Sequence, residues 1–317
     1  MNLVGLKIGH ATHEKYHTGC TVFLCPAEGA VAGVDVRGPA PGSRETALLG
    51  PDKPIERVFA VMLTGGSAFG LATADGAMRY LSERDIGHWT PIRRIPLVPT
   101  AVVYDLFLSQ AQAPDAEMGY QACLNASDRE IQQGNVGAGA GVTVGKWAGF
   151  PHMMKGGFGL TERSHSEYGV TVMAAAVTNA VGDVVNPDGS VLAGAYGEDG
   201  SWLVETNPYH FIDPAQFPIP PVVVGINTTL VVVATNARLT KVETNRLAQR
   251  AHSGLAIAIR PSHTRHDGDT AFALSTGEVE APENLVGNMA VEAVAEAIRN
   301  SVRQAATVGE VKGLMIA

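Results

Sequence analysis

Short apolar runs bounded by turn residues recur along the chain and predict β-strands at 21–25, 30–36, 58–63 and 96–105. The strongest strand candidates are 168–179 and 221–235, which are rich in β-branched residues. Apolar positions at helical spacing predict helices over 68–83, 115–125, 241–259 and 288–304. This mixture favours an α/β sandwich of two sheets with helices on its outer faces over strict βαβ repetition.

A polar Asn227-Thr228-Thr229 interrupts the apolar run at 221–235. Threonine suits a strand and asparagine can sit at a bulge, so a purely structural interpretation of these residues is available. The preceding segment 205–221 is rich in proline and is expected to be an irregular connection. No internal repeat or low-complexity linker divides the sequence, so we expect a single domain over residues 1–317.

Composition narrows the class of protein. The chain has 317 residues, 36 of them glycine, with 6% aromatic residues and a net charge of −8, and no basic stripe is interleaved with aromatics. Many glycines predict closely approaching backbones, and the charge pattern argues against nucleic acid as a partner. The N-terminus lacks the pattern of a secretory signal, and no apolar stretch is long enough for a membrane span. Three sparse cysteines fit a reducing cytoplasm.

Several motifs suggest metal or nucleotide chemistry that their context does not support. His13-Glu14-Lys15-Tyr16-His17 has the HExxH spacing, but Gly9 and Gly19 flank it and a strand pattern follows, so a surface turn is favoured. The tract 134–141 is not the dinucleotide-binding GxGxxG. His263 and His266 lie near two aspartates, but solvated loop residues are the favoured interpretation. Cys20 and Cys25 are expected to be buried free thiols rather than a disulfide or metal pair. We therefore expect neither metal nor organic cofactor.

The order of several motifs resembles the DmpA-type aminopeptidase family of N-terminal nucleophile hydrolases, and within it the nylon-oligomer hydrolase (NylC) branch. The resemblance covers nearly the whole chain. The segments that carry it are Thr64-Gly65-Gly66-Ser67-Ala68-Phe69-Gly70-Leu71, Tyr104-Asp105, the glycine-rich tract leading to Gly145-Lys146, Val177-Thr178-Asn179, Asn227-Thr228-Thr229 and His266-Asp267-Gly268-Asp269-Thr270.

The resemblance implies a four-layer αββα fold of the kind shared with ornithine acetyltransferases. It also implies self-cleavage between Asn227 and Thr228, leaving an α chain of 1–227 and a β chain of 228–317. Aminopeptidases of the family have a serine nucleophile, whereas the nylon hydrolases have threonine after asparagine, and this chain follows the latter. The family further implies a homo-oligomer, typically of four αβ units.

Self-cleavage is chemically coherent at this position. A threonine hydroxyl needs a base within hydrogen-bond reach, and an α-amine titrates near pH 7.7–8.0. After the hydroxyl of Thr228 attacks the carbonyl of Asn227 and the ester hydrolyses, the freed amine supplies that base on the same residue.

The remaining site residues are assigned roles by charge and by the resemblance. Lys146 is expected to keep the amine unprotonated as a nearby cation, or to hydrogen-bond the hydroxyl. Asp267 and Asp269 would hold the amine, Asn179 would donate to the oxyanion, and Tyr104 would donate to the same oxygen or to substrate. Each has a simpler alternative: a solvated lysine, turn-forming Asn and Asp residues, and a structural aromatic.

The leading hypothesis is thus an autoprocessed amide hydrolase that acts on small peptides or on 6-aminohexanoate-type oligoamides through an acyl-enzyme on Thr228. One alternative passes the acyl group to an amine, as ornithine acetyltransferases do. Another is a non-enzymatic oligomeric protein that retains the fold.

Overall fold

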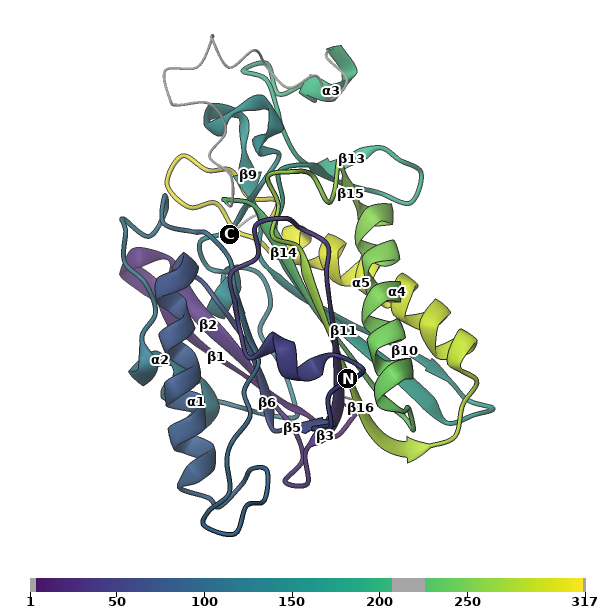
Figure 1. Cartoon of the computed structure of the whole chain (residues 1–317). Coiled ribbons are helices and arrows are strands. Elements are labelled where there is room, and N and C mark those ends of the chain that lie inside the picture. Colours follow the sequence, from purple (N-terminus) through teal and green to yellow (C-terminus); the bar gives the residue numbers. More distant parts are fainter. Residues whose placement is uncertain (1–3, 207–225, 316–317) are drawn as a thin grey trace.

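Two mixed β-sheets lie face to face between pairs of helices in the computed structural model, which describes residues 4–206 and 226–315 (Figure 1). The first sheet has the order β1 (Lys7–His13), β2 (Thr18–Leu24), β6 (Ala60–Thr64), β7 (Thr100–Val102), β4 (Ser43–Arg44). The second has the order β10 (Phe158–His165), β11 (Val170–Asn179), β14 (Thr228–Ala237), β16 (Thr270–Val279), β3 (Ala30–Val36), β5 (Arg57–Val58).

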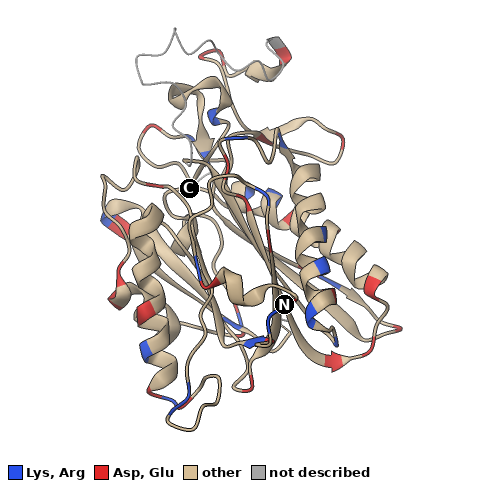
Figure 2. Ribbon diagram, in the orientation of Figure 1, with Lys and Arg blue, Asp and Glu red and all other residues tan. Residues whose placement is uncertain are grey.

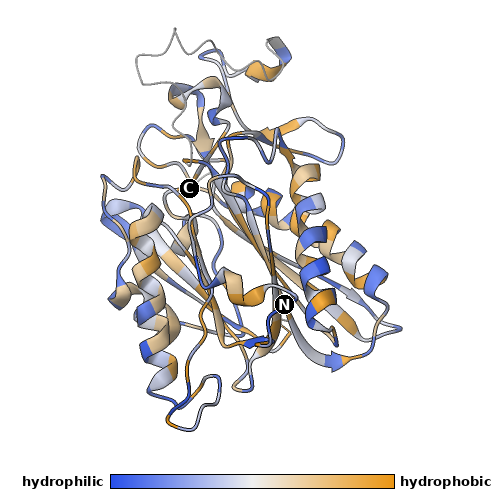
Figure 3. Ribbon diagram, in the orientation of Figure 1, coloured by the Kyte–Doolittle hydropathy of each residue, from blue (hydrophilic) through white to orange (hydrophobic). Residues whose placement is uncertain are grey.

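Helices cover the outer face of each sheet. α1 (Thr73–Ser82) and α2 (Ala116–Leu124) pack on the first sheet, and α4 (Lys241–Ala258) and α5 (Glu283–Arg303) pack on the second. Hydrophilic and hydrophobic residues follow each other in turn along these helices (Figure 3), as expected where only one face of a helix is buried. The layers confirm the αββα expectation.

Side chains of β14 point alternately to the two faces of the second sheet, and both faces are buried. Leu230 and Val232 point into the core between the two sheets, where they join Phe23 and Phe272. Val231 and Val233 point to the other face, under α4 and α5. All ten residues of β14 are buried, which accounts for its nearly continuous apolar sequence.

Smaller elements surround the two sheets. They are the short strands β8 (Thr143–Val144), β9 (Met154–Lys155), β12 (Asp183–Val185), β13 (Val191–Ala193) and β15 (Ile259–Arg260), the helix α3 (Leu203–Thr206), and the 3₁₀ helices η1 (Glu14–Tyr16), η2 (Thr46–Leu49), η3 (Ser67–Ala72), η4 (Gly137–Gly139), η5 (Lys146–Ala148) and η6 (Phe150–His152).

Glycine allows helices to approach the second sheet closely, as its abundance predicts. A Cβ on Gly159 of β10 would lie 2.0 Å from the carbonyl oxygen of Ala297 in α5. A Cβ on Gly33 of β3 would lie 2.5 Å from the backbone nitrogen of Asn245 in α4. Both distances are far below van der Waals contact, so only glycine fits at either point.

Some sequence predictions need correction. The strand expected at 96–105 is only Thr100–Val102, because Pro96 and Pro99 have no N–H to donate to a sheet. The helix expected at 68–83 begins as a 3₁₀ helix and becomes α-helical at Thr73. Most of the proline-rich connection at 205–221, and the first part of the strand expected at 221–235, lie outside the described residues.

Charge and cysteine placement agree with the sequence-based picture. Acidic and basic residues are interspersed over the helices and loops of the described chain (Figure 2). Within that part no helix combines the length and apolarity needed to cross a bilayer. Cys20, Cys25 and Cys123 are free thiols; Cys25 is only half-buried.

Candidate active site

Thr228 is the first residue of β14, an inner strand of the second sheet. Its neighbours across the sheet are Asn179, the last residue of β11, and the segment that leads into β16. The side chain is almost completely buried, with 4% of the residue exposed. Its hydroxyl donates a hydrogen bond to the carbonyl oxygen of Asn227 at 2.5 Å. The hydroxyl therefore already touches the peptide group at which cleavage is expected.

The same carbonyl oxygen has a second donor. The backbone N–H of Gly268 donates to Asn227 O at 2.9 Å. Asn227 and Asp267 form an isolated parallel β-bridge. A Cβ on Gly268 would lie 2.8 Å from Thr228 Oγ1, so a larger residue would crowd the hydroxyl. Sequence reasoning did not assign Gly268 a role. The sequence marks Gly268 only by its position between the two aspartates of the Asp-Gly-Asp motif, which does not indicate a backbone donor.

Asp269 and Asp267 stand on either side of Gly268, both 2% exposed. Asp269 Oδ1 accepts the backbone N–H of Thr229 at 2.7 Å, which ties it to β14. Asp267 Oδ2 accepts the N–H of Thr264 at 2.7 Å. Burial, and after it the charge of Asp269, raise the pKa of Asp267 to about 6 against the opposing effects of the Thr264 hydrogen bonds and the Lys146 charge. Both carboxylates are buried, so the favoured interpretation of this segment as solvated loop residues is wrong for them.

Lys146 reaches the site through Asn179. Its Nζ donates to Asn179 Oδ1 at 2.8 Å, to the Asn179 carbonyl at 3.1 Å, and to the carbonyl of Thr143 at 2.8 Å. Burial holds the pKa of Lys146 well below its usual value, and the charge of Asp267 raises it only in part. Lys146 therefore holds its proton more weakly than an exposed lysine does, and its expected role beside the Thr228 amine stays a prediction.

Asn179 is the hub of this group, and its amide nitrogen is occupied. Asn179 Nδ2 donates to the carbonyl oxygens of Tyr104 and Ile226, each at 3.1 Å. Its Oδ1 accepts from Lys146 and from the backbone N–H of Thr143. The Asn179 side chain therefore connects three segments: the one with Thr143 and Lys146 through Oδ1, and those of Tyr104 and Ile226 through Nδ2.

Tyr104 joins the group through its backbone, since the contact with Asn179 is made by the Tyr104 carbonyl. Its ring lies against Phe107, with ring centres 5.2 Å apart, and Phe107 in turn lies against Phe150 at 4.4 Å. The half-exposed phenol is thus the first of three aromatic rings that lead away from Asn179. The role of hydroxyl donor expected for Tyr104 stays a prediction.

The HExxH spacing does not form a helical metal site. His13 ends β1, Glu14–Tyr16 form a single 3₁₀ turn, and His17 has a left-handed backbone. The two histidines therefore do not share a helix face. In residues 4–206 and 226–315, no group of three or more His, Cys, Asp or Glu side chains is placed to hold a metal ion.

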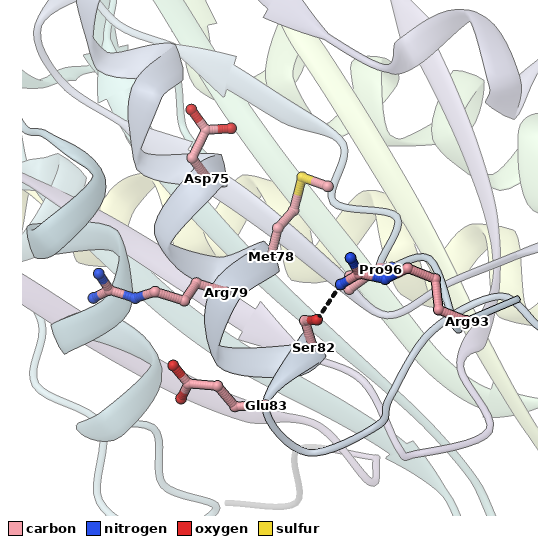
Figure 4. A pocket seen from close by; sticks show the side chains of 7 residues that line it. All are labelled: Asp75, Met78, Arg79, Ser82, Glu83, Arg93 and Pro96. Atoms are coloured by element: carbon pink, nitrogen blue, oxygen red, sulfur yellow. Dashed lines mark hydrogen bonds between the residues drawn. The ribbon is translucent and has the colours of Figure 1, made fainter.

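A surface cavity of about 490 Å³ lies elsewhere, along the outer side of α1 (Figure 4). It is lined by Asp75, Met78, Arg79, Ser82, Glu83, Arg93 and Pro96. Arg93 closes one side by donating to Ser82 at 2.6 Å. None of these residues belongs to the polar group around Thr228, so the cavity and that group are separate features.

Comparison with known proteins connects this geometry to a family. The model of Peptidase family S58 matches residues 2–316. An uncharacterized aminopeptidase of Mycobacterium leprae is 40% identical over 296 residues, covering 88% of this chain and 79% of that protein. A 6-aminohexanoate-oligomer endohydrolase of Paenarthrobacter ureafaciens is 35% identical over 280 residues, covering 88% and 75%.

A solved structure shows the same fold. The L-aminopeptidase D-Ala-esterase/amidase of Ochrobactrum anthropi, described as a variant of the Ntn hydrolase fold, superposes with a TM-score of 0.71. It covers 96% of this chain and 86% of its own, at 18% identity. The fold and the family expected from the motif order are both confirmed.

Proposed function

The chain belongs to peptidase family S58, a family of amide-hydrolysing enzymes, and we propose that Thr228 is its nucleophile after self-cleavage between Asn227 and Thr228. One observation carries the proposal: the carbonyl oxygen of Asn227 lies between the hydroxyl of Thr228 at 2.5 Å and the N–H of Gly268 at 2.9 Å. A nucleophile and an oxyanion donor thereby meet at one peptide group.

Self-cleavage then proceeds in two steps. Thr228 Oγ1 attacks the carbonyl carbon of Asn227, and the Gly268 N–H stabilises the negative charge that develops on the oxygen. Collapse breaks the C–N bond, the nitrogen takes up the proton lost by the hydroxyl, and an ester links Asn227 to Thr228. Water hydrolyses this ester, leaving a carboxylate on Asn227 and a free amine on Thr228.

Lys146 supports the site through Asn179 and through its charge. Its Nζ donates to Asn179 Oδ1, to the Asn179 carbonyl and to the Thr143 carbonyl, and after cleavage its positive charge would disfavour protonation of the Thr228 amine. Its position is set by Asn179, the residue that pairs with Thr228 across the sheet.

Cleavage also frees the donor needed for substrate. Asn179 Nδ2 donates to the carbonyl of Ile226, which belongs to the end of the α chain. When that end moves away, the amide nitrogen becomes available to the oxyanion of a bound substrate, the role expected from the sequence. Asp269 and Asp267 precede β16 and contact the start of β14, which supports the expectation that they hold the new amine of Thr228.

We take the substrates to be peptides or short oligoamides. The names of the relatives point to both: an aminopeptidase and a hydrolase of 6-aminohexanoate oligomers. The enzyme would form an acyl-ester on Thr228, release the amine product, and hydrolyse the ester with water. Its nucleophile and base are on one residue, so the mechanism uses only groups of the chain itself.

The test compares wild type with Thr228→Ala. Wild type should give two chains, 1–227 and 228–317, in denaturing mass spectrometry, whereas Thr228→Ala should stay intact because it has no hydroxyl to attack Asn227. Thr228→Ser keeps the hydroxyl and serves as the matched control, which should still be cleaved. Processed protein should release amines from peptide amides and 6-aminohexanoate oligomers.

The proposal fails if wild type remains a single inactive chain, or if Thr228→Ala hydrolyses these amides at the wild-type rate. Adding an excess of a second amine distinguishes hydrolysis from acyl transfer. Hydrolysis yields free acid as the main product, whereas a transferase yields the new amide.

A further inference from the structure

A histidine pair lies behind Asp269, on the side away from β14. His263, in the loop between β15 and β16, donates its backbone N–H to Asp269 Oδ2 at 3.2 Å, and its ring Nδ1 lies 2.8 Å from the same oxygen. The other oxygen, Oδ1, accepts the N–H of Thr229. The carboxylate is therefore held from both ends, with β14 on one oxygen and His263 on the other.

The geometry fixes how the imidazole is used. A carboxylate accepts hydrogen bonds, so Nδ1 carries the proton in this contact. His263 Nε2 is buried without a hydrogen-bond partner. Rotating the ring would leave Nδ1 without its partner and would leave Asp269 Oδ2 with only the backbone N–H of His263. The ring therefore has one favourable orientation, in which Nδ1 donates to Asp269 Oδ2.

His252 of α4 supports that orientation. Its ring packs edge-on against His263, with ring centres 4.8 Å apart and planes at 68°. His252 is 2% exposed, and its Nε2 lies 3.0 Å from the carbonyl oxygen of Asp35 and 3.5 Å from the Asp35 carboxylate. Burial lowers the pKa of His252, which favours its neutral form.

The backbone at His263 shows that this arrangement is held at a cost. Its φ is +54°, in the left-handed region, which is uncommon for residues other than glycine, although asparagine, aspartate and histidine adopt it more often than the rest. Such conformations persist where the surrounding structure compensates for them, and they concentrate at functional sites. Here the compensation is visible as the two contacts from one residue to one carboxylate oxygen.

We propose that His263 is a positioning residue that holds the Asp269 carboxylate against Thr229 and thereby sets the place of the Thr228 hydroxyl and amine. The inference rests on the proposed function of Thr228. It adds a residue two contacts away from the nucleophile, which acts through Asp269 and does not touch the substrate. Small displacements of reacting groups cost as much as about 100-fold in rate, so loss of this contact should appear in turnover.

The experiment uses two substitutions that both tolerate the left-handed backbone. His263→Asn keeps a side-chain N–H that can reach Asp269 Oδ2, and His263→Gly has no side-chain donor. His88→Asn, at an exposed loop position, is the matched control. For each full-length protein we would measure the rate of self-cleavage by mass spectrometry, kcat and KM of the processed enzyme on a peptide amide, and the thermal midpoint.

We expect His263→Gly to slow self-cleavage and to lower kcat by about tenfold or more with KM nearly unchanged, because the binding surface is intact while the nucleophile is misplaced. His263→Asn should recover most of the loss, and His88→Asn should match wild type. If His263→Gly does not fold, His263→Asp replaces it. That side chain has the shape of asparagine but repels Asp269, so its kcat should fall well below that of His263→Asn.

Two results would overturn the inference: a folded His263→Gly with wild-type self-cleavage and kcat, or equal losses of kcat in the Asn and donor-free variants. Failure of the proposed function looks different, because Thr228→Ala would then retain activity whatever happens at position 263.

Discussion

Thr228 owes its chemistry to the residues that converge on it from distant parts of the chain. Taken alone it is a threonine that begins a buried strand. In the folded protein its hydroxyl touches the carbonyl of Asn227, and the neighbouring Gly268 and Asp267 lie across from that peptide. Burying a carboxyl group such as that of Asp267 lowers the stability of the folded protein. Proteins tolerate such a cost at functional sites.

This cost is measurable at Asp267. Its folded pKa of about 6 is above the ordinary unfolded value of about 3.9. A raised pKa means that the stability contribution is fully present below about pH 4 and is lost as pH rises through about 6. In a Thr228→Ala background, which prevents cleavage, Asp267→Asn should therefore stabilise the chain at pH 7.5 by about 1–3 kcal/mol. The gain should vanish below about pH 4.

Urea unfolding of Thr228→Ala with and without Asp267→Asn, at pH 4 and pH 7.5, measures this difference. The exposed Asp128→Asn provides the control and should change stability little at either pH. An Asp267→Asn protein that is less stable than its parent at pH 7.5 would contradict the expectation.

At the scale of elements, pairing between β14, β11 and β16 brings the site together. β14 and β16 are parallel, so both begin at the same edge of the sheet, and β11 is antiparallel to β14, so it ends there. Thr228, Asn179 and Asp269 are consequently neighbours although they lie far apart in sequence. The second sheet is held in shape by α4 and α5, which pack on it at glycine contacts.

Gly159→Ala tests the importance of that close approach. A methyl group placed 2.0 Å from the Ala297 carbonyl must push α5 away from β10, since neither is a flexible side chain. We expect a loss of about 1–3 kcal/mol in the free energy of unfolding. Denaturant titration monitored by circular dichroism measures it.

Gly50→Ala is the control for this substitution. Its φ is −53° and the nearest obstacle is the tip of the exposed Asp52 side chain, so it should be nearly neutral. Equal stability of the Gly159→Ala and Gly50→Ala proteins would show that α5 has room to move.

At the scale of the whole molecule, ionisable groups are buried near the site between the sheets. Lys155 is 1% exposed, and its Nζ donates to the carbonyls of Ala140 and Val142 in the glycine-rich tract. Burial lowers its pKa to about 7, while the charge of Asp105 raises it. Asp105 in turn accepts from Thr18. This network joins the glycine-rich tract to the segment that carries Tyr104.

Lys155 should make stability depend on pH. Its folded pKa of about 7 is below the ordinary value of about 10.4, so its contribution is fully present above about pH 10 and is lost as pH falls through about 7. In the Thr228→Ala background, which prevents cleavage, the stability of the chain with wild-type Lys155 relative to Lys155→Met should thus increase by roughly 1.4 kcal/mol per pH unit between about pH 7 and 10. Urea unfolding at pH 7, 8 and 9 provides the values.

Lys7→Met, at an exposed position of β1, is the matched control and should show no such slope. A difference in stability between the chains with and without Lys155→Met that stays constant from pH 7 to 9 would be inconsistent with a lowered folded pKa.

Local pattern was sufficient for most elements of the second half of the chain. The helix expected at 241–259 is Lys241–Ala258, because a Thr240–Glu243 capping box and an apolar face mark it clearly. The helix expected at 288–304 begins five residues earlier, directly after its N-cap Pro282, whose backbone is extended. Short strands such as β12 and β15 were missed, since two or three residues carry no measurable period.

The amino-acid sequence by itself determined the αββα fold, the family and the bond at which cleavage is proposed, because these depend on residue types in a fixed order along the chain. Only the tertiary structure decided which atoms meet: the Gly268 N–H at the Asn227 carbonyl, His263 on Asp269, and Asn179 Nδ2 on the end of the future α chain. Backbone donors and buried partners have no signature in sequence. They arise when strand register places distant segments within about 3 Å of one another.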